Sequence, residues 1–177
     1  LNYPKGLAVD AQAEFLFVCD RSNHRVVKLR LSDGEMVASL GHANGARGNG
    51  EGLFKYPQGL DFSCTVAHGP MLFVSDYGND RIVALDCDLQ WRFTFGEARG
   101  GEGQLTAALP AGCAASASEV AVVDASRHCV HLYSTEDGAL LRTLCGGVGD
   151  HRLDHPWSCA WAPSGDRLLV GEGASSG

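Results

Sequence analysis

The sequence of 177 residues contains no long apolar run. No segment approaches the roughly 18 consecutive apolar residues of a membrane-spanning helix. No basic stretch followed by an apolar core comes after Leu1, so we expect no targeting peptide and take the chain as part of something longer. Basic residues are also few, with 14 Lys and Arg against 21 Asp and Glu. This acidic balance argues against a surface that binds nucleic acid on every side.

Paired cysteine motifs are absent as well. The 7 cysteines are odd in number and none forms a C-x-x-C pair, which disfavours a disulfide scaffold. They lie within or beside apolar runs, as Cys19 and Cys87 do, where cysteine serves as a small buried hydrophobe. We therefore predict free thiols in a reducing compartment and an intracellular, cytoplasmic location.

Recognisable catalytic motifs are missing too. The glycine-rich stretch 45–52 lacks the Lys-Ser or Lys-Thr pair of a phosphate-binding loop. A second glycine-rich stretch at 96–103 occupies the same place one repeat later, which predicts connectors between repeated units. We predict no catalytic residues, and expect a protein that is not an enzyme.

What the sequence does contain is a repeat of about 50 residues. Each copy opens at a proline and later has a short apolar run that ends in an acid. The prolines are Pro4, Pro57, Pro110 and Pro156, and the acids are Asp20, Asp76, Asp124 and Glu172. The approximate repeats are 1–55, 56–108, 109–154 and an incomplete 155–177.

The runs within each repeat predict β-strands. They are four or five residues long, rich in branched and aromatic side chains, and separated by Gly, Asp, Asn and Ser, which favour turns. The run that ends in the acid is apolar on both faces, as in a strand covered from two sides. Four antiparallel strands in about 50 residues are typical of a propeller blade.

The repeat resembles the NHL repeat family. Its pattern is matched in the first repeat by Pro4, Gly6, Asp10, Asp20, Asn23, Arg25, Asp33 and Gly34. The second repeat matches through Pro57, Gly59, Asp76, Asn79 and Arg81, whereas the third lacks the Asn and has Cys129 in place of the Arg. The resemblance implies an all-β, NHL-type β-propeller of six blades, of which three and half of a fourth are present. The remaining blades would come from the same longer chain or from another subunit.

The family's arrangement implies that the turns between second and third strands, with the connectors, share one end of the ring. Loops held there by stiff blades suit partner binding. The predicted partner-binding residues are Arg21, His24, Arg47, Tyr77, Asp80, Arg99, Arg127, His128 and His151. The residues predicted to hold the turns are Asp20, Asn23, Arg25, Asp76, Asn79, Arg81 and Asp124.

Zinc chemistry is one alternative function. The amidating lyases have a similar propeller with a central zinc held by histidines of several blades, and this chain has 7 histidines. Only His155 precedes a repeat proline, while Tyr3, Tyr56 and Leu109 occupy that place elsewhere. No histidine triad can be assigned, so we predict no metal ligands and no cofactor.

RNA binding is the other alternative, because some NHL propellers of ubiquitin ligases bind RNA on a basic face. Residues 1–55 carry a net charge of +1, but residues 56–109 and 110–177 carry −4 each. A basic strip confined to one blade gives few phosphate contacts, so nucleic acid is an unfavoured partner. The main prediction is a platform that binds another protein, without contact to a membrane.

Overall fold

The computed structural model describes residues 1–96, 105, 110–146 and 153–173, and these form strands joined by short turns. The two helices among them are single 3-10 turns, so no helix of the described part is long or apolar enough to cross a membrane. The strands are β1 (Pro4–Val9), β2 (Phe15–Asp20), β3 (Arg25–Arg30), β4 (Met36–Gly41), β5 (Leu60–Thr65), β6 (Gly69–Asp76), β7 (Arg81–Asp86), β8 (Trp91–Phe95), β9 (Cys113–Ala115), β10 (Glu119–Asp124), β11 (Cys129–Ser134), β12 (Leu140–Leu144), β13 (Pro156–Trp161) and β14 (Leu168–Glu172). The helices are η1 (Arg21–Asn23) and η2 (Tyr77–Asn79).

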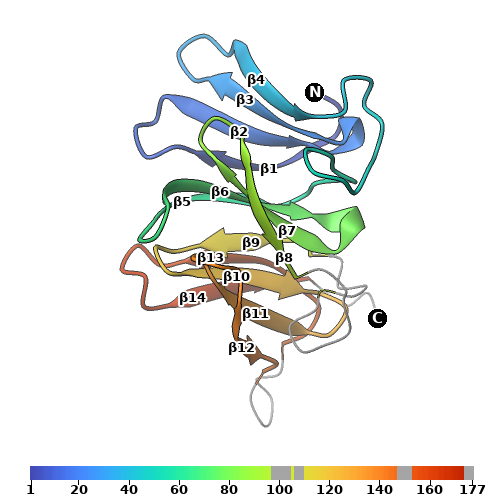
Figure 1. The fold of residues 1–177 in the computed structure, drawn as a ribbon. Helices are drawn as coiled ribbons and strands as arrows, with labels where there is room; N and C mark the ends of the chain where they lie inside the picture. The colour runs from blue at the N-terminus through green and yellow to red at the C-terminus, as the bar shows by residue number, and fades with distance from the viewer. Residues whose placement is uncertain (97–104, 106–109, 147–152, 174–177) are drawn as a thin grey trace.

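The strands form one sheet per repeat. Blades 1, 2 and 3 are four-stranded, in the orders β1-β2-β3-β4, β5-β6-β7-β8 and β9-β10-β11-β12, and every pairing is antiparallel. The fourth blade consists of β13 and β14. Figure 1 shows the sheets packed one against the next in chain order. The all-β propeller blades predicted from the sequence are confirmed, and the closed ring of six stays a prediction, since the described strands close no ring.

The centre of each blade is buried on both faces, as the apolar runs predict. Phe17 of blade 1 packs against Leu72 of blade 2 in one cluster, which the connector residue Phe54 also joins. Phe73, on the other face of β6, packs with Tyr133 of blade 3 in the next cluster. Blade 2 is therefore covered from both sides, which is why its central strands are almost wholly apolar.

The repeated Pro-x-Gly allows the innermost strands of neighbouring blades to approach closely. The Gly6 amide donates to the Gln58 carbonyl at 2.7 Å, and a Cβ on Gly6 would lie 2.6 Å from that oxygen. A Cβ on Gly59 would likewise lie close to the next blade, 3.0 Å from the Ala111 carbonyl oxygen. Glycine recurs here because a side chain would force the blades apart.

The cysteines depart in part from the prediction of free thiols. Cys19, Cys64, Cys87, Cys113 and Cys159 are free, but Cys129 and Cys145 form a disulfide. This bridge joins the start of β11 to the residue after β12. In blade 1 the paired residues at that place are Arg25 and Gly41. The sequence pattern showed Cys129 in the Arg position, but the partner depends on the pairing register of the outer strands.

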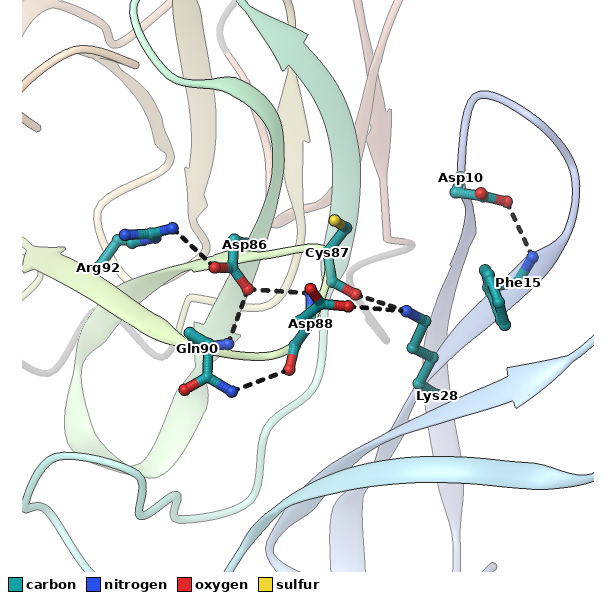
Figure 2. A network of polar contacts seen from close by, with 8 residues as sticks. All are labelled: Asp10, Phe15, Lys28, Asp86, Cys87, Asp88, Gln90 and Arg92. Carbon is teal, nitrogen blue, oxygen red and sulfur yellow. Dashed lines mark hydrogen bonds and ion pairs between the residues drawn. The ribbon is translucent and has the colours of Figure 1, made fainter.

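A buried lysine joins blades 1 and 2 at the end of the sheets opposite the 3-10 turns. Lys28 of β3 is 8% exposed, and its Nζ donates to the Cys87 carbonyl at 2.8 Å. The same Nζ lies 3.5 Å from Asp88 Oδ1 and 4.1 Å from the centre of the Phe15 ring. Figure 2 shows Lys28 reaching from its strand to the turn between β7 and β8, which Asp86 holds through the amides of Asp88 and Gln90. Lys28 thus ties blade 1 to blade 2 at this end of the sheets.

Candidate functional site

The turn between second and third strands is built on a buried carboxylate in blades 1 and 2. In blade 2, Asp76 Oδ2 accepts hydrogen bonds from Asn79 Nδ2 at 2.7 Å and Arg81 Nε at 2.8 Å. Its Oδ1 accepts the backbone N–H of Lys55, two residues before the repeat proline, at 2.7 Å. A residue of the connector between blades 1 and 2 is therefore fixed to the turn of blade 2.

Blade 1 repeats this arrangement. Asp20 accepts from Asn23, Arg25 and the backbone N–H of Asn2, at 2.8, 2.7 and 2.6 Å. Burial raises the pKa of Asp20, but these hydrogen bonds outweigh it and hold the pKa below its ordinary value. The Asn2 bond corresponds to the Lys55 bond of blade 2. In the fourth blade Glu172 serves the same purpose, since its Oε1 accepts the Asp154 amide at 2.6 Å.

Blade 3 lacks the Asn and the Arg and replaces them with other donors. Ser126 Oγ and the Arg127 amide donate to Asp124 Oδ1 at 2.7 and 2.9 Å. His131 Nε2 lies 3.4 Å from Asp124 Oδ2. Burial raises the pKa of Asp124, yet the hydrogen bonds from His131 and Ser126 leave it below its ordinary value. The buried carboxylate of blade 3 is therefore still hydrogen-bonded, although other residues take the place of the Asn and the Arg.

Arg81 also organises the connector between blades 1 and 2. Its guanidinium donates to the carbonyls of Asn49 at 2.7 Å, Leu53 at 2.9 Å and Gly50 at 3.3 Å. The side chain of Asn79 donates to the Gly48 carbonyl at 2.8 Å. The glycine-rich stretch thus serves as a connector between two blades and wraps around the turn. Its carbonyl oxygens, and not its amides, face the side chains of Asn79 and Arg81.

The residue before each third strand has a left-handed backbone. His24, Asp80 and His128 have φ values of 52°, 50° and 54°. His24 Nδ1 accepts the backbone N–H of Tyr56, the residue before the next repeat proline, at 3.0 Å. His128 Nδ1 accepts the N–H of His155 in the same way, also at 3.0 Å. Both histidines, predicted as partner contacts, therefore make a hydrogen bond to the next blade, and His24 is only 8% exposed.

A group of aromatic and basic side chains, the Arg21 cluster, lies at the junction of blades 1 and 2. It comprises Arg21, Tyr56, Tyr77 and His24. The Arg21 guanidinium carbon lies 5.0 Å from the centre of the Tyr56 ring and 5.7 Å from that of Tyr77. The His24 ring meets Tyr56 edge to face at 4.4 Å. Arg21 Nε is buried and has no hydrogen-bond partner, and within the described residues no carboxylate pairs with Arg21.

The charge around this cluster is positive. Burial, with Arg47 and Arg21 nearby, lowers the pKa of His24 below its ordinary value. The sequence predicted Arg21, His24 and Tyr77 as neighbours on one face, and the structure brings them together. Tyr56 was missed as a contact residue. Its position before a repeat proline, which Tyr3 and His155 share, was the available signal.

The remaining predicted contact residues are spread over other parts of the turns. Arg47 and Arg127 are exposed, and Asp80 is half-buried. Arg127 and His128 belong to the junction of blades 3 and 4, two junctions beyond that of the Arg21 cluster, so they do not join it. Arg99 and His151 lie outside the described residues. Partner binding by all of these residues stays a prediction.

The junction of blades 3 and 4 holds a group that could bind a metal ion: His128, Asp154 and His155. Their ligand atoms lie within 4.8 Å of one another. The sequence predicted no metal ligands, because no histidine triad could be assigned to the repeat positions. Both histidines occupy repeat positions, and that was the signal that could have paired them.

The side of the blades that carries the innermost strands offers little for chemistry. A concave space of about 340 Å³ lies along β1, β5, β9 and β13. Its lining residues come from the four segments that begin the blades, and Lys5 is the one charged residue among the described ones. Nothing in this lining resembles an acid–base pair or a nucleophile with its base.

Comparisons with known proteins agree with this fold. The family model "NHL repeat" matches residues 1–29. NHL repeat-containing protein 2 of Gallus gallus is 29% identical over 92 residues, which are 50% of this chain and 12% of that protein. The chain thus spans about an eighth of the length of this relative.

A solved structure of Kuenenia stuttgartiensis hydrazine synthase matches the whole chain with a TM-score of 0.69. The match covers 44% of that chain at 14% identity, so it bears on the fold alone. The repeat model and the curated relative support the NHL repeat family that the sequence pattern predicted, and the four-stranded blades fit it.

Proposed function

We propose that this chain is part of a non-enzymatic, intracellular platform that binds another protein through the end of its blades that carries η1 and η2. The Arg21 cluster is the observation that supports the proposal. Two tyrosine rings and a guanidinium are held together there at half-buried positions, and Arg and Tyr are enriched among residues that dominate binding energy at interfaces.

The cluster also indicates the chemistry of the partner. Arg21 has no carboxylate partner within the described residues, and Arg47 adds a second positive charge near His24. A partner segment with an acidic side chain would pair with Arg21, while apolar groups beside that acid would cover Tyr56 and Tyr77. The carboxylate of such a partner would accept a charge-assisted hydrogen bond from the Arg21 guanidinium.

The blades supply the stiffness that such a site needs. The turn carrying Arg21 is tied to Asp20, and the loop carrying Tyr56 is tied to His24. Side chains that are ordered before binding lose less conformational entropy when a partner arrives. The local order of the cluster thus favours recognition of a defined surface.

RNA is a less favourable partner because the positive charge ends with blade 1. The repeats that follow carry −4 each, so a phosphate backbone running along the ring would meet repulsion beyond the Arg21 cluster. The lyase alternative needs histidines of several blades around one zinc ion, whereas among the described residues two histidines, His128 and His155, come together with Asp154.

The test is a quantitative capture experiment with the purified protein as bait. Arg21→Ala and Tyr77→Ala together should remove specific partners, whereas Arg142→Ala, at an exposed pair with Glu119 on blade 3, should retain them. Thermal unfolding of each bait checks that the fold is intact. Ribonuclease treatment separates RNA-mediated capture from direct binding. A partner set that is the same for the double variant and for the control would refute the proposal.

A further inference from the structure

The junctions between blades 1 and 2 and between blades 3 and 4 share one backbone arrangement. In each, the histidine before the third strand accepts the N–H of the residue before the next proline, at 3.0 Å. That residue has a positive φ in both, 54° at Tyr56 and 44° at His155. The side chains that this arrangement brings together can therefore be compared position by position.

The two junctions differ in chemistry. The first has Lys55 and Tyr56 beside His24, whereas the second has Asp154 and His155 beside His128. Where the first junction has the ammonium group of Lys55 and the phenol of Tyr56, the second has a carboxylate and an imidazole. The second junction therefore has three metal-binding side chains, and the first has one. Two imidazoles with a carboxylate are a usual donor set for zinc and neighbouring transition metals.

The distances at the second junction are close to those that a metal requires. His155 Nδ1 lies 2.7 Å from Asp154 Oδ1, and His128 Nδ1 lies 3.7 Å from the same oxygen. Ligand atoms around a tetrahedral zinc ion stand roughly 3.3–3.5 Å apart, given bonds of about 2.0–2.1 Å. To bind zinc, the His155–Asp154 distance must lengthen and the His128–Asp154 distance must shorten, each by less than about 1 Å. The side chains have room for this change, since all three are at least 33% exposed.

We propose that His128, Asp154 and His155 bind one divalent transition-metal ion of the zinc type across the junction of blades 3 and 4. Three protein ligands leave a fourth position for water, because the group faces solvent. The ion replaces two existing contacts, the Asp154–His155 pair and the hydrogen bond that His128 Nδ1 accepts from the His155 amide. It joins blade 3 to blade 4 more firmly than that bond does, and this assignment is independent of the proposed protein partner.

The experiment uses the purified protein after removal of metal with a chelator and dialysis. Zinc binding is measured by titration calorimetry, and visible absorption on adding Co²⁺ reports the coordination geometry. We expect one zinc per chain in addition to any weak surface binding, and a higher melting temperature in the presence of zinc.

The variants follow from the comparison of the junctions. His155→Tyr and Asp154→Lys introduce the residues that the first junction carries on the same backbone, so the fold should survive. Each should weaken zinc binding at least about tenfold, since even partners of metal ligands contribute that much. His24→Asn is the matched control, because asparagine tolerates a positive φ and still accepts a hydrogen bond, and it should bind zinc as the wild type does.

The outcomes separate clearly. The site is supported if His155→Tyr and Asp154→Lys both lose zinc binding and the zinc-dependent rise in melting temperature, while His24→Asn keeps both. A wild-type protein that binds no zinc, or zinc binding of equal affinity in His155→Tyr and Asp154→Lys, would overturn it. Circular dichroism of each variant shows that loss of binding does not come from loss of the fold.

Discussion

Replacing Arg81 with methionine should be among the most damaging single changes in the turns. The Arg81 side chain is 6% exposed and that of Asp76 is fully buried, and their N–O distance is 2.8 Å. Methionine keeps part of the apolar stem but leaves the Asp76 carboxylate without its cation. It also removes the donors to the carbonyls of Asn49, Gly50 and Leu53. Removing one partner of a buried pair costs about 3–5 kcal/mol of the free energy of unfolding.

Arginines that contact the buried acid of the other blades from a similar or different position in the turn give a graded comparison. Arg25 makes one hydrogen bond to Asp20 and its side chain is 28% exposed, so its loss should cost about 1.5–3 kcal/mol. Arg127 is 46% exposed and lies 3.5 Å from Asp124 Oδ2. Such an exposed, long pair contributes about 0–1 kcal/mol. The expected order of destabilisation is Arg81, then Arg25, then Arg127.

Urea unfolding followed by circular dichroism measures these differences. The slope of the transition should stay constant, so that a lower midpoint reports a lower stability. Arg142→Met is the control, because its pair with Glu119 lies on the exposed side of blade 3. If Arg81→Met destabilises no more than Arg142→Met does, the buried ion pair does not hold the turn. If Arg25→Met abolishes partner binding at unchanged stability, Arg25 belongs to the contact surface instead.

Three further predictions test the fold at other places. Gly6→Ala should lower the free energy of unfolding by about 1–3 kcal/mol in urea titrations, because its Cβ would lie 2.6 Å from the Gln58 carbonyl oxygen. Gly50→Ala, where the nearest atom is 3.7 Å away, should cost less, and equal effects would contradict the close approach of the inner strands. Because the pKa of His24 is lowered, the unfolded chain binds a proton at a higher pH than the folded protein, so stability should fall as pH drops below about 6.5. Unfolding midpoints across this pH range should decline less in His24→Asn, and an unchanged profile would remove His24 as the cause. Alkylation of the denatured protein should label five cysteines without reductant and seven after reduction, and Cys145→Ser should lower stability by about 3 kcal/mol, as expected for a bridge between residues 16 apart. Seven labelled cysteines without reductant would show that the bridge is absent and would favour the reducing compartment that the sequence predicted.

The blades and their turns follow from local features of the amino-acid sequence. Short apolar runs with turn residues between them fix strands locally, and the recurring proline, glycine and acid mark the same points in each blade. The positions of Asp20 and Asp76 at the turns could be predicted, because their partners Asn23, Arg25, Asn79 and Arg81 lie three and five residues away in the chain.

Contacts between distant residues were decided only by the tertiary structure. The Cys129–Cys145 disulfide depends on the register of β11 against the end of β12, which no local pattern specifies. Lys28 reaches Cys87, and His128 meets His155, because neighbouring blades pack at a particular distance and rotation. A repeat pattern defines each unit, but side chains of two units meet only after the units have packed, and the candidate sites of this protein lie at those junctions.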